Sequence, residues 1–203
     1  MKQQERRQKT MEQLMRSVKE LIAEKGCDAI TMKDIMDRSG LSKGAIFHYI
    51  DSKEELFAKV LEERLEEINE RFIREVEAGA EEASGPMRQI ASGFSDLEDG
   101  GDITNKVLAY LAGKSSQPAV SKVLHRYYEA SVRYSVSWIE AGQQKGVIPP
   151  EVEAAKASEL FVLLSFGMRL RAVIGGESHP AFGIPDYTAL IERTLGIDTH
   201  KEE

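Results

Sequence analysis

The stretch TMKDIMDRSGLSKGAIFHY, residues 31–49, decides the fold of this chain. It holds two short runs with helical spacing of apolar residues, about 32–39 and 43–49, on either side of Gly40-Leu41-Ser42. A glycine in such a turn relieves the steric conflict where the chain reverses between two helices. The stretch therefore predicts a helix-turn-helix.

Helical periodicity continues on both sides of this motif, and alternating β-branched runs are absent. Leu14, Val18, Leu21 and Ile22 share one face of a helix that Gly26 ends. The chain is therefore predicted to be all helix, without internal repeats or low-complexity tracts. The predicted helices cover about 9–25, 32–39, 43–49, 53–78, 86–98, 103–113, 118–145, 151–174 and 187–196.

Side chains that cap helix N-termini stand where these helices are predicted to begin. Thr31-x-x-Asp34 and Ser52-x-x-Glu55 resemble capping boxes, and Ser42 is placed to cap the third helix. Asp186 is expected to cap the last helix in the same way. The helix over about 53–78 is on the order of 40 Å long, enough to link two domains.

Composition limits the class of protein. The chain has 203 residues, 41% of them apolar, so it can bury a sizeable core. Its single cysteine, Cys27, excludes an intramolecular disulfide and a cysteine cluster for a metal, and we expect it to be a small buried residue. The N-terminus lacks the apolar core of a signal peptide, and the stretch Leu160–Ile174 is too short to span a bilayer. We expect a cytoplasmic protein with no membrane, metal or cofactor.

The formal charge of −7 is unevenly distributed along the chain. Residues 1–60 carry 12 Lys and Arg against 10 Asp and Glu, a net charge of +2. Residues 61–203 carry 15 against 24, a net charge of −9. Charge in the N-terminal part therefore permits DNA binding without demonstrating it.

The two short helices have one face to bury and one to expose. Ile35, Met36, Leu41 and Ile46 are expected to pack against the first helix. A third helix presented in this way lies in the major groove, where the edges of the bases are distinguishable. Its exposed face is predicted to carry Lys43, Gly44, Ala45, Phe47, His48 and Tyr49.

Four segments in order resemble the DNA-binding domain of the TetR family: AEKG (23–26), TMKDI (31–35), SGLSKGAIFHYI (39–50) and SKEEL (52–56). The resemblance covers about residues 9–60. It implies a three-helix DNA-binding domain over 1–52, then a helical domain for ligand binding and dimerisation over 53–203, with about nine helices in all.

The resemblance also implies roles for single residues. The Thr31 hydroxyl would bind a phosphate, and Lys53 matches a phosphate-binding lysine. Phe47 stands where the family often has tyrosine, so it can offer only apolar contact, for instance to a thymine methyl group. The implied DNA-binding residues are Thr31, Ser42, Lys43, Gly44, Ala45, Phe47, His48, Tyr49 and Lys53.

Simpler interpretations stay open for several of these side chains. Phe47 and Tyr49 are also compatible with a place in the core, and His48 with a solvated surface. Lys53 is also compatible with a surface lysine paired with nearby acids.

An aromatic stripe runs along the helix over about 118–145, and it fits either a ligand pocket or the core. Arg169 lies in an apolar helix and needs a partner, either an anionic ligand group or an acid such as Glu140 or Glu159. The candidate ligand-binding residues are Tyr110, Tyr127, Ser131, Tyr134, Trp138, Phe161, Ser165, Met168 and Arg169.

The helix over about 151–174 is apolar on more than one side, so we expect one side to meet a partner subunit. In the TetR family the last two helices pair across a two-fold axis into a four-helix bundle. The resemblance implies this for about 155–174 and 187–196. The candidate dimer contacts are Leu160, Leu163, Gly167, Leu170 and Ile174.

The function implied is that of a transcriptional regulator, most simply a repressor. A homodimer would bind a palindromic double-stranded operator and be released by an apolar or amphipathic small molecule. A regulator without a ligand, or an activator, stays open. An enzyme is disfavoured, because there are only four histidines, no Cys/His cluster, no glycine-rich phosphate loop and no evident nucleophile–base pair.

Overall fold

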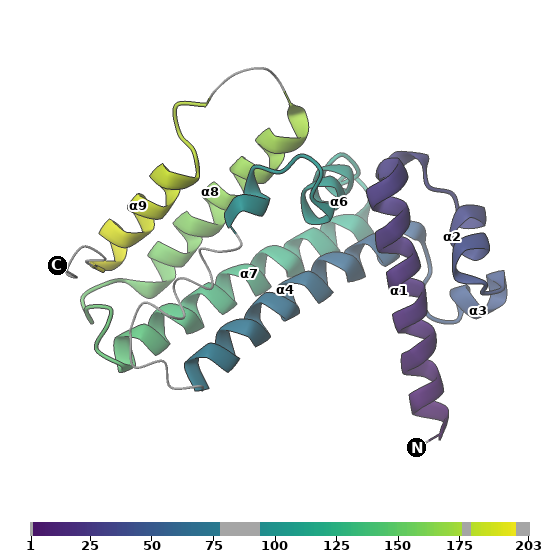
Figure 1. Ribbon diagram of the computed structural model, residues 1–203, viewed down its shortest axis with the longest axis horizontal. Coiled ribbons are helices and arrows are strands. Elements are labelled where there is room, and N and C mark those ends of the chain that lie inside the picture. The colour runs from purple at the N-terminus through teal and green to yellow at the C-terminus, as the bar shows by residue number, and fades with distance from the viewer. Residues whose placement is uncertain (1, 78–93, 176–179, 198–203) are drawn as a thin grey trace. The chain divides into compact units, whose positions relative to one another are not determined.

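The computed structural model describes residues 2–77, 94–175 and 180–197, and every regular element in them is a helix (Figure 1). The prediction of an all-α fold is confirmed. Among the helices described, none carries an apolar stretch long enough to cross a bilayer. The elements are α1 (Lys2–Ala29), α2 (Met32–Ser39), α3 (Lys43–Phe47), α4 (Lys53–Glu77), the 3₁₀ turn η1 (Phe94–Leu97), α6 (Ile103–Ala112), α7 (Pro118–Gln144), α8 (Ala154–Ile174) and α9 (Ile184–Leu195).

The chain forms two compact units. The first comprises Met1–Arg64 with Gly101–Arg126, and the second Leu65–Gly100 with Tyr127–Glu203. Helices α4 and α7 each contribute to both units. A functional boundary between residues 52 and 53 stays a prediction.

In the first unit, α1 packs against α2 and α6. The predicted apolar face of α1 is buried, with Leu14, Val18 and Ile22 fully enclosed. Ile35 of α2 and Ile46 of α3 are also fully buried, as predicted, whereas Met36 and Leu41 are half-buried. One fully buried isoleucine from each helix therefore anchors the helix-turn-helix in the first unit.

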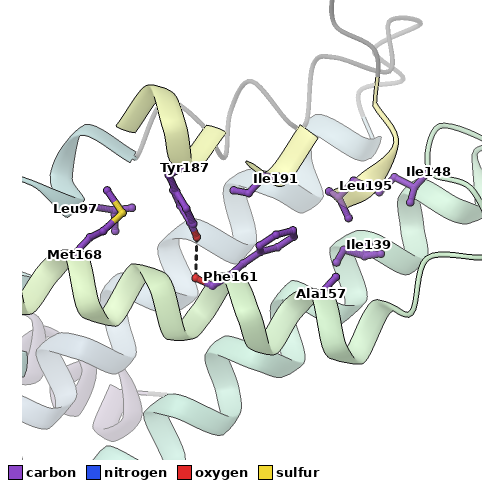
Figure 2. Packing of buried hydrophobic residues seen from close by; sticks show 9 residues of the cluster. All are labelled: Leu97, Ile139, Ile148, Ala157, Phe161, Met168, Tyr187, Ile191 and Leu195. Atoms are coloured by element: carbon purple, nitrogen blue, oxygen red, sulfur yellow. Dashed lines mark hydrogen bonds between the residues drawn. The ribbon is translucent and has the colours of Figure 1, made fainter. Parts of the chain in front are cut away.

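In the second unit, α8 packs against η1 and α9 around one apolar cluster (Figure 2). The Tyr187 hydroxyl of α9 donates a hydrogen bond to the Phe161 carbonyl of α8 over 2.8 Å. Burial raises the pKa of Tyr187, so this hydroxyl stays a donor. The cluster consists of Leu97, Ile139, Ile148, Ala157, Phe161, Met168, Tyr187, Ile191 and Leu195.

Two bounds in the first unit differ from those predicted. Helix α1 begins at Lys2 rather than near residue 9, because its polar first turns are good helix formers with no apolar periodicity to reveal them. Its regular geometry is interrupted at Gly26, whose φ of 72° favours glycine. Helix α3 ends at Phe47, and His48 is its C-terminal cap.

Two predictions fail at helix ends in the second unit, and a third lies mostly outside the described residues. Helix α8 begins at Ala154, because the chain first turns with Val152 N–H donating to the Pro149 carbonyl. Helix α9 begins at Ile184, so Asp186 is not its cap; it lies in the first turn and accepts from the Gly183 N–H over 2.9 Å. Of the helix predicted over 86–98, only η1 lies within the described residues.

Candidate nucleic-acid interface

The first helix of the motif is capped as its sequence predicts. The Asp34 N–H donates to the Thr31 hydroxyl over 3.2 Å, and the Thr31 N–H donates to the Asp34 carboxylate over 2.9 Å. This reciprocal pair satisfies two backbone groups that a helix start leaves without partners. Hydrogen bonds from Lys25 and Thr31 hold the pKa of Asp34 well below its usual range, so this acid is ionised at neutral pH.

The turn between the two helices depends on Gly40. Its φ of 66° is left-handed, a region that a residue with a Cβ reaches only at a cost, and its N–H closes α2 on the Met36 carbonyl over 2.9 Å. Two residues later the Ser42 hydroxyl accepts from the Ala45 N–H over 3.2 Å and starts α3. Both predicted caps of the motif, Thr31 and Ser42, are confirmed.

Polar contacts hold α2 on α1. Arg38 donates to both carboxylate oxygens of Glu24, over 2.8 and 2.6 Å, and reaches Glu20 over 3.3 Å. The hydrogen bond from Arg38 lowers the pKa of Glu24. Lys25 pairs with Asp34 over 2.7 Å. The fork of a guanidinium on a carboxylate fixes direction as well as distance, so these pairs orient α2.

Helix α3 leaves one face uncovered. Ser42, Lys43, Gly44, Phe47 and His48 are exposed, while Ile46 points into the core. A Cβ added at Gly44 would meet no atom within 4 Å, so backbone is open to close approach there. Residues 42–49 include no acid, and the Lys43 ammonium lies 5.7 Å from the centre of the Phe47 ring. The surface is small, cationic and apolar.

Phe47 is the most informative member of this surface. It is a large apolar side chain that stays 40% exposed at the end of a five-residue helix. The open possibility that Phe47 is a core residue is therefore excluded for this unit. Tyr49 and Ala45 are half-buried beside it.

Two predicted phosphate contacts have intramolecular partners. The exposed Thr31 hydroxyl donates to Asp34 over 2.6 Å. The Lys53 ammonium donates to the backbone carbonyls of Ile30 and Cys27, over 2.8 and 3.2 Å. Neither set of contacts involves the exposed face of α3.

Arg7 lies against Tyr49, two residues after the end of α3, and the sequence did not predict this contact. Its guanidinium carbon is 5.5 Å from the centre of the Tyr49 ring, within the range of a cation–π contact. It lies in the polar turns before the predicted start of the first helix, and no local pattern relates residue 7 to residue 49.

The candidate ligand-binding residues fall into separate groups. Tyr110 belongs to the first unit, where its hydroxyl donates to Glu54 over 2.8 Å. In the second unit Phe161 and Met168 belong to the apolar cluster (Figure 2). Ser165 donates to the Val162 carbonyl, and Arg169 is half-buried on the same helix.

Several side chains of the aromatic stripe along α7 have hydrogen-bond or ring partners within the second unit. The Trp138 indole N–H donates to the Asn69 side chain over 3.0 Å, and its ring lies 5.2 Å from that of Phe72. The Tyr127 ring lies 5.7 Å from that of Phe166. Ser131 donates to the Tyr127 carbonyl, whereas Tyr134 is half-buried, with the Arg133 guanidinium 5.5 Å from its ring centre.

The sequence did not indicate the buried hydroxyl of Ser158. Ser158 on α8 is fully buried, and its oxygen has no hydrogen-bond partner within the described part of the chain. A lone serine among apolar residues gives no signal in the sequence. A buried polar group of this kind costs about 1–3 kcal/mol unless something binds it.

The candidate dimer contacts form one exposed stripe on α8. Leu160, Leu163, Leu170 and Ile174 are all exposed, and a Cβ added at Gly167 would meet nothing within 4 Å. The opposite side of the same helix supplies Phe161 and Met168 to the core. Helix α8 is thus apolar on two sides, and the described residues cover one of them.

Comparisons with known proteins agree with this geometry. Residues 14–60 match the family described as bacterial regulatory proteins, tetR family. The uncharacterised helix-turn-helix regulator YfiR of Bacillus subtilis is 25% identical over 170 residues, 81% of this chain and 80% of that protein.

Two solved structures share the fold. Salmonella enterica GusR superposes with a TM-score of 0.65 at 20% identity, covering 92% of this chain and 95% of that one. A transcriptional regulator of Saccharomonospora viridis, solved in complex with choline, gives a TM-score of 0.65 at 15% identity and covers 93% and 96%. Residues 14–60, which hold the capped helix-turn-helix, therefore match the DNA-binding domain of the TetR family, and the chain shares the fold of these solved regulators.

Proposed function

We propose that the protein is a dimeric, ligand-responsive repressor that reads a palindromic DNA operator. The observation that carries DNA reading is the exposed face of α3, with Lys43, Gly44 and Phe47 at its centre. An ammonium can donate to guanine, a bare backbone admits close approach, and a phenyl ring can contact a thymine methyl group. The proposed contacts are Thr31, Ser42, Lys43, Gly44, Ala45, Phe47, His48 and Tyr49.

The stripe on α8 supports a symmetric dimer. Its large members are spaced so that they repeat along one side of the helix, and exposed apolar surface of this extent marks an interaction site. A two-fold axis brings the same stripe of two copies together. The dimer would present two α3 helices to half-sites one DNA turn apart, roughly 34–36 Å.

The proposed ligand would bind in the second unit. The half-buried side chains of Tyr134, Ser165 and Arg169, together with the unsatisfied Ser158 hydroxyl, offer apolar area and a few polar atoms on α7 and α8. The choline complex of the Saccharomonospora viridis regulator supports a small amphipathic molecule as the effector class.

The proposed mechanism is a shift between two states. The free dimer holds its two α3 helices at the operator spacing. A ligand that binds a different arrangement more tightly draws the population away from DNA, by no more than the ratio of its affinities for the two states. Helix α4 is the proposed link, because it begins beside α3 and continues into the second unit.

The test begins with selection of duplexes from a random library by the purified protein. We expect a palindrome whose half-site centres are about 10 base pairs apart. Thermal-shift screening with apolar drugs, fatty acyl derivatives and quaternary amines then seeks an effector. A compound that stabilises the protein and weakens operator binding supports the repressor; one that stabilises it and strengthens binding contradicts release by ligand.

A further inference from the structure

The first residues of α4 lie in a cluster of charged and aromatic side chains that the exposed DNA-reading face does not include. Two backbone carbonyls at the end of α1, those of Ile30 and Cys27, accept hydrogen bonds from the Lys53 ammonium over 2.8 and 3.2 Å. Carbonyls at a helix C-terminus lack partners and carry partial negative charge. Lys53 therefore acts as a cap for α1.

Two aromatic rings enclose the same ammonium. It lies 5.6 Å from the ring centre of Phe57 and 5.2 Å from that of Tyr110, and these rings meet edge to face at 5.3 Å. Both rings are buried. The charge of Lys53 is thus divided between carbonyl oxygens and aromatic faces inside the first unit.

Glu54 connects the cluster to α6. Its carboxylate accepts a hydrogen bond from the Tyr110 hydroxyl over 2.8 Å and lies 3.7 Å from the Lys114 ammonium. Burial raises the pKa of Tyr110, and the hydrogen bond to Glu54 raises it further, so the hydroxyl remains a donor. Tyr110 therefore contacts both of the first two residues of α4.

The cluster joins three helices at one point: the end of α1, the first turn of α4 and the last turn of α6. Helix α1 carries α2, and α4 directly follows α3 in the chain, so the same contacts fix the support of the DNA-reading helix. We propose that Lys53 is a positioning residue clamped by Tyr110, and that it supports operator binding from within the protein without contacting a phosphate. This rests on the proposed DNA-binding function.

The two roles of Lys53 differ in their dependence on salt. Loss of one phosphate contact reduces the slope of log affinity against log salt by about 0.9, because fewer counterions are released. Loss of a positioning residue weakens binding and leaves that slope unchanged. The comparison uses Lys53→Met, with Lys122→Met, an exposed lysine of α7, as the charge-matched control.

We expect Lys53→Met to bind the operator about tenfold more weakly with the wild-type slope, the size typical of breaking one coupled contact. Tyr110→Leu, which removes the ring that faces the ammonium, should weaken binding in the same direction. The Lys53→Met/Tyr110→Leu double variant should fall short of the product of the two effects. A slope reduced by about 1 in Lys53→Met, or two fully independent effects, would overturn the proposal.

Thermal unfolding of the same four proteins tests the cluster without DNA. The wild type, two single variants and double variant should show coupled changes in unfolding temperature, while Lys122→Met melts as the wild type does. Coupled melting without any operator binding by the wild type would refute the proposed function and leave the cluster intact. Additive melting effects would refute the clamp itself.

Discussion

Replacing Leu163 by glutamate should dissociate the dimer while leaving each subunit folded. Leu163 is 54% exposed on α8, and glutamate is a good helix former, so the helix should persist. The exposed fractions of Leu160, Leu163, Leu170 and Ile174 are 41, 54, 47 and 74%, together about two whole side chains. At about 1.5–3 kcal/mol for each, the stripe offers about 3–6 kcal/mol per subunit.

Leu163→Glu changes the interface at two places, because a two-fold interface contains residue 163 of both subunits. Losing half a buried leucine in each subunit removes about 2 kcal/mol from dimerisation, and two facing carboxylates add repulsion and desolvation. We therefore expect the dimer dissociation constant to rise at least about 30-fold. Sedimentation velocity over a dilution series measures it.

Ile73→Glu is the matched control, because Ile73 is 43% exposed on α4 and lies outside the stripe. It should leave the dimer unchanged. An unchanged dissociation constant for Leu163→Glu, or equal weakening by both variants, would refute the interface on α8.

Four further outcomes follow from the N-terminal unit. Lys43→Ala should change base preference at particular operator positions in a selection experiment, whereas uniform weakening would remove its role in reading bases. Arg7→Gln should weaken operator binding by loosening Tyr49, measured by anisotropy; equal affinity would leave the cation–π contact without function. Cys27 is buried with a pKa raised to about 12, so a thiol reagent at pH 8 should label this single cysteine only after unfolding, and rapid labelling of the folded protein would contradict its burial. The carboxylate of Asp34 has a lowered pKa, so its stabilisation is present above about pH 4 and is lost as pH falls further; Asp34→Asn should flatten the melting temperature in that range, and an unchanged pH profile would refute it.

Local signals in the sequence predicted the helix-turn-helix closely. The bounds of α2 agree with the prediction, because the threonine cap, the acid three residues later and the terminal glycine all act within one helix. The stripe on α8 could also be predicted, because the sequence places apolar residues on more than one side of this helix.

Contacts between distant segments could not be predicted in the same way. Nothing in the sequence indicated that the Tyr110 hydroxyl donates to Glu54, 56 residues earlier in the chain, and its role in ligand binding stays a prediction. The carbonyls that accept from Lys53 lie 23 and 26 residues away, and no local pattern relates them to it. The prediction that Asp186 caps α9 failed for a local reason. The helix begins two residues earlier, after a glycine and with a proline in its first turn.

The exposed face of α3 is proposed to read DNA sequence in a dimer. Fluorescence anisotropy at fixed salt should compare the selected palindrome with a shuffled duplex of the same composition, for the wild type and for Phe47→Ala. We predict that two protomers bind each palindrome at least about a thousandfold more tightly than the shuffled duplex, and that Phe47→Ala reduces this ratio. Equal affinity of the wild type for both duplexes would contradict the claim.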